Sequence, residues 1–239
     1  MDIRGKIVAS GLAGGMTIAL AACGSSASPG SGNGGSAAAS RSTPELVSQM
    51  KTAVRNATSM HLTGQVDANG RQAVLDLSLL RSGDLSGSIT ENGVPLHLIG
   101  SGGKVYVKAT PAFLRQLRES KAVCVLMCGK YVQMSGAEGS RLSGSLSMTN
   151  LTRALTSSIP HLTRTGTATV AGQQAIELRG ADGSTVDVAA SGPPYPLRVI
   201  SPPSHHERVL FSQWNQVHTP TPPKSSEVIN LSKLKASNS

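Results

Sequence analysis

Short segments of alternating apolar and polar residues recur along the chain between residues 61 and 214, many of them separated by Gly, Asn or Asp. Successive side chains of a β-strand point to opposite faces of its sheet, so the alternation predicts strands with one apolar face. Tight turns such as Asn69-Gly70 and Glu91-Asn92-Gly93 predict that neighbouring strands are antiparallel. The expected strands are 61–67, 73–79, 84–90, 94–98 and 105–107, then 163–170, 173–179, 185–190, 196–201 and 208–214.

Three other segments have helical periodicity. The first runs from Pro44 to Thr58 and follows Ser42-Thr43, so that a capping residue precedes a first-turn proline. Further helices are expected at 111–119 and 146–157, between the two groups of strands. An antiparallel sheet with one apolar face must cover that face. The predicted fold class is therefore α+β, a curved antiparallel sheet, or half-barrel, covered by helices.

The chain begins with Arg4 and Lys6 before a largely apolar stretch that ends in Leu20-Ala21-Ala22-Cys23. This order is typical of a signal peptide, and the stretch is shorter than the roughly 20 residues of a membrane-spanning helix. Its last four residues resemble the lipobox of bacterial lipoproteins. We therefore expect a signal peptide at 1–22, cleavage before Cys23 and acylation of the Cys23 thiol. The mature protein is then expected at the extracytoplasmic face of the cell membrane, held by this lipid anchor.

The segment 23–41 contains Gly, Ser, Ala, Pro and Asn but no large apolar residue. Such a composition cannot build a core and is typical of a flexible tether. The segment 42–235 is long enough for one domain with a sizeable core. We expect a single folded domain there, followed by a polar tail at 236–239.

We predict that Cys23→Ala produces a chain without attached lipid, because no other residue near the expected cleavage site has a thiol. Loss of the acyl chains should release the protein from membranes, since each buried methylene contributes about 0.8 kcal/mol to anchoring. Metabolic labelling with a fatty-acid analogue measures the acylation. Label that persists on the Cys23→Ala protein would contradict the lipoprotein assignment.

Charge and motif content exclude several classes of function. The formal net charge is +9, but the cations are scattered and aromatic residues are only 3% of the chain, so no nucleic-acid-binding face is expected. A basic surface would suit anionic lipid headgroups. The sequence has no G-x-S-x-G or H-E-x-x-H motif, and the adjacent His205 and His206 would point to opposite faces of a strand. We therefore expect no enzymatic activity, no metal ion and no cofactor.

Cys124 and Cys128 are the two cysteines that remain besides Cys23. A zinc site would need two further ligands nearby, and a redox pair usually has two intervening residues in a thioredoxin-like unit. An exported protein meets an oxidising compartment. A structural disulfide that closes a short loop is therefore the favoured interpretation of this pair.

Several segments together resemble a known family of lipoproteins. They are Ala57-Thr58-Ser59-Met60-His61-Leu62-Thr63-Gly64, the strand pair around Gly87 and Val94, Gly103-Lys104-Val105-Tyr106-Val107-Lys108, Lys130-Tyr131-Val132, and Pro222-Pro223 with Val228-Ile229-Asn230-Leu231. In order and spacing they resemble the actinobacterial lipoproteins of the LppX, LprA, LprF and LprG type, whose fold is akin to the LolA and LolB lipoprotein carriers. The resemblance covers roughly residues 43–235. It implies a LolA-like half-barrel whose apolar pocket holds acyl chains of lipids or glycolipids.

The candidate pocket lies where the apolar rows of the strands face the apolar stripe of the first helix. The leading hypothesis is a membrane-anchored envelope lipoprotein that binds or carries a lipid or glycolipid there. The same rows could instead form a solid core, and the domain would then be a non-enzymatic interaction platform in the cell envelope. The sequence leaves the identity of the lipid and the oligomeric state open. The candidate lining residues are Leu46, Met50, Val54, Leu75, Leu77, Leu79, Ile89, Leu96 and Leu98.

Overall fold

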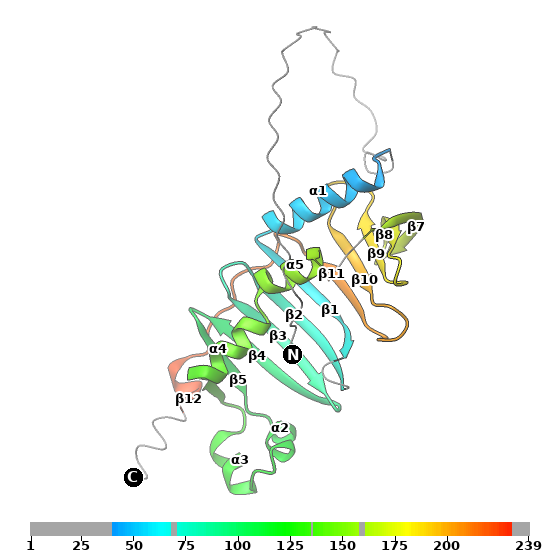
Figure 1. Ribbon diagram of the computed structural model, residues 1–239. Helices are drawn as coiled ribbons and strands as arrows, with labels where there is room; N and C mark the ends of the chain where they lie inside the picture. The colour runs from blue at the N-terminus through cyan, green and yellow to red at the C-terminus, as the bar shows by residue number, and fades with distance from the viewer. Residues whose placement is uncertain (1–39, 68–70, 135, 158–160, 231–239) are drawn as a thin grey trace, which may run out of the picture. The chain divides into compact units, whose positions relative to one another are not determined.

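The computed structural model describes residues 40–67, 71–134, 136–157 and 161–230 (Figure 1). The expected signal peptide at 1–22, the lipidation site Cys23, all but the last two residues of the expected tether at 23–41, and the polar tail at 236–239 lie outside the described residues. These assignments and the domain boundaries drawn from them remain predictions. Among the helices that are described, none combines the length and the apolar composition needed to cross a membrane.

The strands form one twelve-stranded sheet. In chain order they are β1 (Ser59–Asp67), β2 (Gln72–Leu80), β3 (Leu85–Glu91), β4 (Val94–Ser101), β5 (Lys104–Lys108), β6 (Tyr131–Met134), β7 (Thr163–Val170), β8 (Gln173–Arg179), β9 (Thr185–Ala189), β10 (Pro196–Ile200), β11 (Arg208–Ser212) and β12 (Val228–Asn230). Across the sheet the order is β12-β6-β5-β4-β3-β2-β1-β11-β10-β9-β8-β7. Hairpins connect most neighbours, whereas β1 pairs with β11 and so joins the two groups of strands. The β12–β6 pair is parallel, and the other pairs are antiparallel.

Helices cover one face of this curved sheet. They are α1 (Thr43–Asn56), α2 (Pro111–Gln116), α3 (Lys121–Met127), α4 (Gly136–Ser145) and α5 (Met148–Ser157), with a 3₁₀ helix η1 at Ser225–Glu227. Figure 1 shows α1, α5 and α4 crossing the sheet, while α2 and α3 lie together at the lower end of the view. The apolar stripe of α1, Leu46, Met50 and Val54, is completely buried against the sheet. The predicted α+β class, a helix-covered antiparallel sheet, is thus confirmed.

The region between the two groups of strands is more helical than the sequence analysis predicts. Ser120 and Thr110 cap α3 and α2, each accepting a hydrogen bond from a backbone N–H three residues on. Arg118 has a φ of +61°, a left-handed conformation that separates these two short helices. The predicted helix at 146–157 is α5 and starts at Met148. Helix α4 was not predicted because glycine and serine, which are weak helix formers, are frequent in it.

The apolar rows expected on β2, β3 and β4 share one face of the sheet. Leu75 pairs with Ile89, and Ile89 pairs with Leu96 on the next strand. The neighbouring row places Gly87 between two buried leucines, Leu77 and Leu98. A Cβ atom on Gly87 would lie 2.0 Å from the carbonyl oxygen of Asp76, and its φ is +141°. The close approach of β2 and β3 therefore requires glycine at this position.

The expected disulfide between Cys124 and Cys128 is present in the structure. It joins the last turn of α3 to the residue that caps it, with the two Cα atoms 4.8 Å apart. Both cysteines pack beside Val132 of β6 and Leu114 of α2 in a small core of their own. The bridge thus closes the last turn of α3, and the packing of its two cysteines places that turn against β6.

Candidate functional site

Two apolar cavities lie between the sheet and its helices. We call them the α2–α3 cavity, of about 510 Å³, and the α5 cavity, of about 450 Å³. Both volumes fall within the range of small-molecule sites, which is roughly 300 to 1,000 Å³. Both open partly to solvent and have mostly apolar walls, so a ligand could enter them. The two cavities are therefore the candidate functional site.

The α2–α3 cavity has an almost wholly apolar wall. Val107 of β5 and Val132 of β6 are direct cross-strand partners and form part of its floor. Its cover comes from α2, α3 and α4, so that three short helices enclose one end of the sheet. Glu119 is the charged residue among those lining it. The full lining is Leu96, Val107, Phe113, Leu114, Leu117, Glu119, Val123, Met127, Val132, Met134 and Leu142.

The α5 cavity lies between α5 and strands from both groups. Leu151 and Leu155 are four residues apart on α5, so both face the sheet from successive turns. The floor combines β1 and β2 with β9, β10 and β11, which are brought together by the β1–β11 pairing. Its apolar lining is Leu62, Val66, Leu75, Leu77, Leu146, Leu151, Leu155, Val186, Val199, Ile200, Pro202, Val209 and Phe211.

A single row of side chains links the two cavities. Leu75 lines the α5 cavity and Leu96 lines the α2–α3 cavity, and Ile89 pairs with both of them across the sheet. Adjacent strands are about 4.8 Å apart, so Leu75 and Leu96 are separated by about 10 Å. On the helical side, Leu142 and Leu146 line the two cavities in the same order, and the Leu146 N–H donates to the Leu142 carbonyl. The cavities are neighbours along one apolar surface.

Polar groups gather at one end of the α5 cavity. Asp182, Ser184, Ser201 and Glu207 line it where β9 starts and β10 ends. The hydroxyl and then the backbone N–H of Ser184 donate to Asp182 and lower the pKa of its carboxyl. Glu207 accepts a hydrogen bond from the backbone N–H of Asp67 at 3.1 Å. Carboxylate and hydroxyl oxygens are therefore available at the edge of an otherwise apolar cavity.

The structure separates the predicted lining residues into two sets. Leu75, Leu77 and Leu96 line the cavities, and Ile89 lies half-buried between Leu75 and Leu96. The other five candidates, Leu46, Met50, Val54, Leu79 and Leu98, are buried in the solid part of the core and line neither cavity.

Sequence reasoning missed the contributions of α2, α3 and α4, and it did not assign the α5 stripe to a site. The apolar stripe that includes Leu151 and Leu155 was recognised as helical. Which helix faces a cavity depends on tertiary packing, and the periodicity of a helix predicts only that one face is buried.

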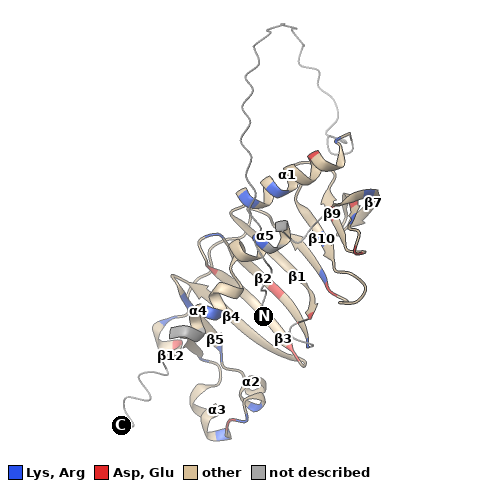
Figure 2. Ribbon diagram, viewed as in Figure 1, with Lys and Arg blue, Asp and Glu red and all other residues tan. Residues whose placement is uncertain are grey.

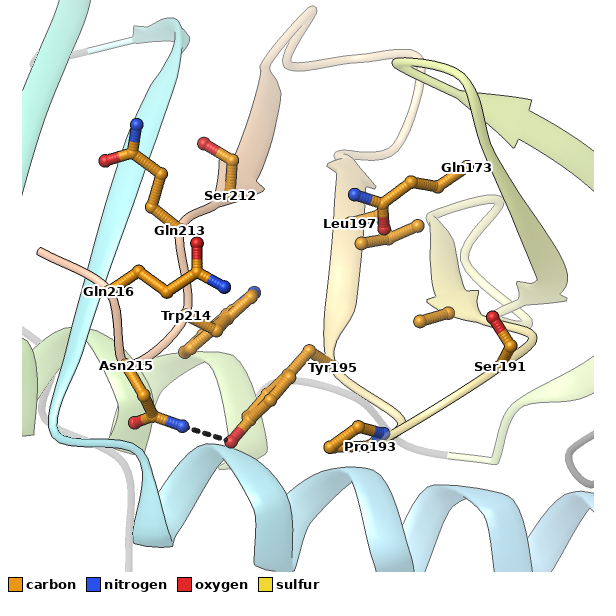
Figure 3. Close-up of a pocket in the computed structure, with 11 residues that line it drawn as sticks. Gln173, Ser191, Pro193, Tyr195, Leu197, Ser212, Gln213, Trp214, Asn215 and Gln216 are labelled. Atoms are coloured by element: carbon orange, nitrogen blue, oxygen red, sulfur yellow. Dashed lines mark hydrogen bonds between the residues drawn. The ribbon is translucent and has the colours of Figure 1, made fainter. Parts of the chain in front are cut away.

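A third pocket, of about 330 Å³, is lined by polar and apolar residues together (Figure 3). The rings of Tyr195 and Trp214 stack there with centroids 4.7 Å apart. The Asn215 amide donates to the Tyr195 hydroxyl at 2.7 Å and accepts hydrogen bonds from both the N–H and the hydroxyl of Thr58. The Trp214 indole donates to the Pro196 carbonyl. These groups are engaged within the protein, where they tie the chain after β11 to the starts of β1 and β10.

Comparisons with known proteins find chains of similar fold among the solved structures. No protein-family model matches the sequence, and no curated protein matches it. The solved structure of LprF from Mycobacterium bovis matches with a TM-score of 0.53 and 14% sequence identity, over 75% of this chain and 96% of that chain. MucB in complex with MucA(peri) and the Pseudomonas aeruginosa MucA/MucB complex match with TM-scores of 0.32 and 0.30 at 13% and 12% identity, over 77% and 76% of this chain and 58% of each of those chains. The chain has an LprF-like fold, as the resemblance in sequence implied.

Proposed function

We propose, from the fold that this chain shares with LprF, that it is an envelope lipoprotein that binds or carries a lipid or glycolipid. The observation that carries the proposal is the pair of neighbouring apolar cavities between helices and sheet. A non-enzymatic role agrees with this arrangement, because the lining of both cavities is dominated by aliphatic side chains. The expected lipid anchor on Cys23 would keep such a protein beside the membrane from which its ligand comes.

Burial of acyl chains would provide the binding free energy. Each methylene that moves from water into an apolar cavity contributes about 0.8 kcal/mol. The row formed by Leu75, Ile89 and Leu96 offers a continuous apolar surface from one cavity to the other. A ligand with more than one chain could therefore occupy both cavities at once. Aliphatic walls adapt to flexible chains and require no fixed hydrogen-bond pattern.

The polar edge of the α5 cavity would accommodate the headgroup. Asp182 and Glu207 present carboxylate oxygens, which accept hydrogen bonds from hydroxyl groups. Hydrogen bonds to ionised acceptors are stronger than those between neutral groups. A headgroup with several hydroxyls, such as a sugar, fits these acceptors better than an anionic headgroup does.

Native mass spectrometry of the full exported chain tests this proposal. A bound lipid should appear as extra mass in the native spectrum and disappear under denaturing conditions, whereas a covalent anchor persists in both. Lipid extraction followed by tandem mass spectrometry would then give its headgroup and chain lengths. Native and denatured masses that agree in every preparation would contradict the carrier proposal and favour the interaction platform.

A further inference from the structure

Exposed apolar side chains are concentrated on the segment 111–130, which we call the α2–α3 tip. Large hydrophobic residues are strongly exposed at four positions in the described part of the chain, and three of these lie in the tip. Leu117 is 53% exposed, Val125 85% and Leu126 70%. Isolated exposed apolar residues are common on protein surfaces, but a cluster of them is typical of a site that contacts a membrane or another protein.

The geometry of α3 fixes the outward direction of these side chains. Val123, Cys124 and Met127 pack inward against the small core beside β6. Residues of an α-helix are 100° apart, so Val125 and Leu126 must face away from that core. The Cys124–Cys128 disulfide closes the last turn of this helix. Val125 and Leu126 are thus presented on a covalently closed helical turn.

The tip also carries four cations. Arg115, Arg118, Lys121 and Lys130 are all exposed, and Glu119 is the acidic residue of the tip (Figure 2). None of these four cations forms an ion pair within the described ranges. An apolar patch bordered by Lys and Arg is complementary to a bilayer with anionic headgroups, because the acyl region takes the apolar groups and the phosphates attract the cations.

The tip is also a wall of the α2–α3 cavity. Leu117, Val123 and Met127 line that cavity, and Leu117 is at the same time exposed to solvent. The outward and inward faces of the tip are therefore opposite sides of one short helix, α3. A surface that contacts the membrane here would bring the cavity next to the acyl chains of the bilayer.

We propose that the α2–α3 tip docks on an anionic membrane surface, with Val125 and Leu126 inserted among the acyl chains and the four cations against the phosphates. Docking here places the α2–α3 cavity where a lipid chain can enter or leave it. The role of this contact in lipid transfer rests on the proposed function, whereas docking itself does not. Each cation near an anionic surface adds about fivefold to binding, so the contact weakens as salt concentration rises.

Tryptophan placed on the tip tests the docking directly. Leu126→Trp and the matched Val74→Trp are introduced separately into the full chain, since Val74 is an apolar residue that is 51% exposed outside the tip. The natural Trp214 is buried, and its emission in the parent chain is subtracted. The probes are vesicles of equal parts phosphatidylcholine and phosphatidylglycerol, with and without brominated acyl chains.

The Leu126→Trp emission should shift to shorter wavelength and be quenched at least about twofold by brominated chains, with a smaller effect at high salt or with phosphatidylcholine alone. The Val74→Trp emission should stay unchanged. Equal quenching of both probes would indicate general adsorption or anchoring by another segment and would overturn the proposal. Absence of quenching at both positions would also overturn the docking proposal. A protein partner would then be the better explanation for the exposed apolar face of the tip.

Transfer of bound lipid provides a second readout. Val125→Asp with Leu126→Asp should slow transfer to acceptor vesicles about tenfold or more, whereas Val74→Asp should not, and all variants should keep the parent thermal midpoint because these residues are exposed. Lipid retained in native spectra together with unchanged transfer would count against the tip but leave the carrier function intact. Empty native spectra with persistent quenching of the Leu126→Trp probe would support docking and contradict the carrier function instead.

Discussion

Leu96→Trp and Leu151→Trp should each remove most of the bound lipid while changing the thermal midpoint by less than about 4 °C. Both residues are half-buried and line a cavity, Leu96 on the α2–α3 side and Leu151 on the α5 side. An indole can extend into the empty volume without displacing packed neighbours, and it occupies the space that an acyl chain needs. Native mass spectrometry measures the retained lipid, and differential scanning calorimetry measures the midpoint.

Met50→Trp is the matched control for this pair of variants. Met50 is completely buried in the solid part of the core and borders neither cavity. Overpacking there should lower the stability by about 1 to 3 kcal/mol, because no free volume takes up the larger ring. If Leu96→Trp and Leu151→Trp unfold the domain as readily as Met50→Trp does, the cavities are not available to a ligand and the solid platform becomes the better hypothesis.

Local sequence patterns predicted the sheet because strand periodicity is a local property. The alternation of Leu75, Leu77 and Leu79 indicates an apolar face whatever lies across from it. The short strands β6 and β12 escaped prediction because four and three residues hold too little periodicity to separate strand from loop. Their pairing also depends on segments that are nearly 100 residues apart in the chain.

The division of the apolar rows into cavity and core could not be predicted in the same way. Leu96 and Leu98 are both leucines, and they lie two residues apart on the same face of β4. Leu98 is nevertheless packed in the core, whereas Leu96 faces open volume. The difference depends on how the covering helices pack, with α2 in contact with β4 and α4 in contact with β5. Helix crossing positions follow from side-chain shapes on both partners, which a binary apolar pattern does not encode.

The outer face of the sheet contains a buried ion pair whose disruption should be as consequential as any core truncation. Asp187 lies between Val186 and Val188 on β9, whose side chains belong to the main core, so its carboxylate points to the opposite face. It is completely buried, and the Arg198 guanidinium of β10 donates to its Oδ2. The other oxygen, Oδ1, has no hydrogen-bond partner in the described structure. Arg198 therefore supplies the compensation for this buried charge.

Arg198→Ala should lower the free energy of unfolding by about 3 to 5 kcal/mol, since it leaves the Asp187 carboxylate buried without a counter-charge. Replacing both residues by leucine should restore most of that loss, because well-packed apolar pairs are often as stable as the buried ion pairs they replace. Arg208→Ala, at an exposed position on β11, is the control and should stay within about 0.5 kcal/mol of the parent. Urea unfolding followed by circular dichroism gives all three values. A loss of less than about 1 kcal/mol in Arg198→Ala would mean that water reaches Asp187, and the pair would then be an ordinary surface contact.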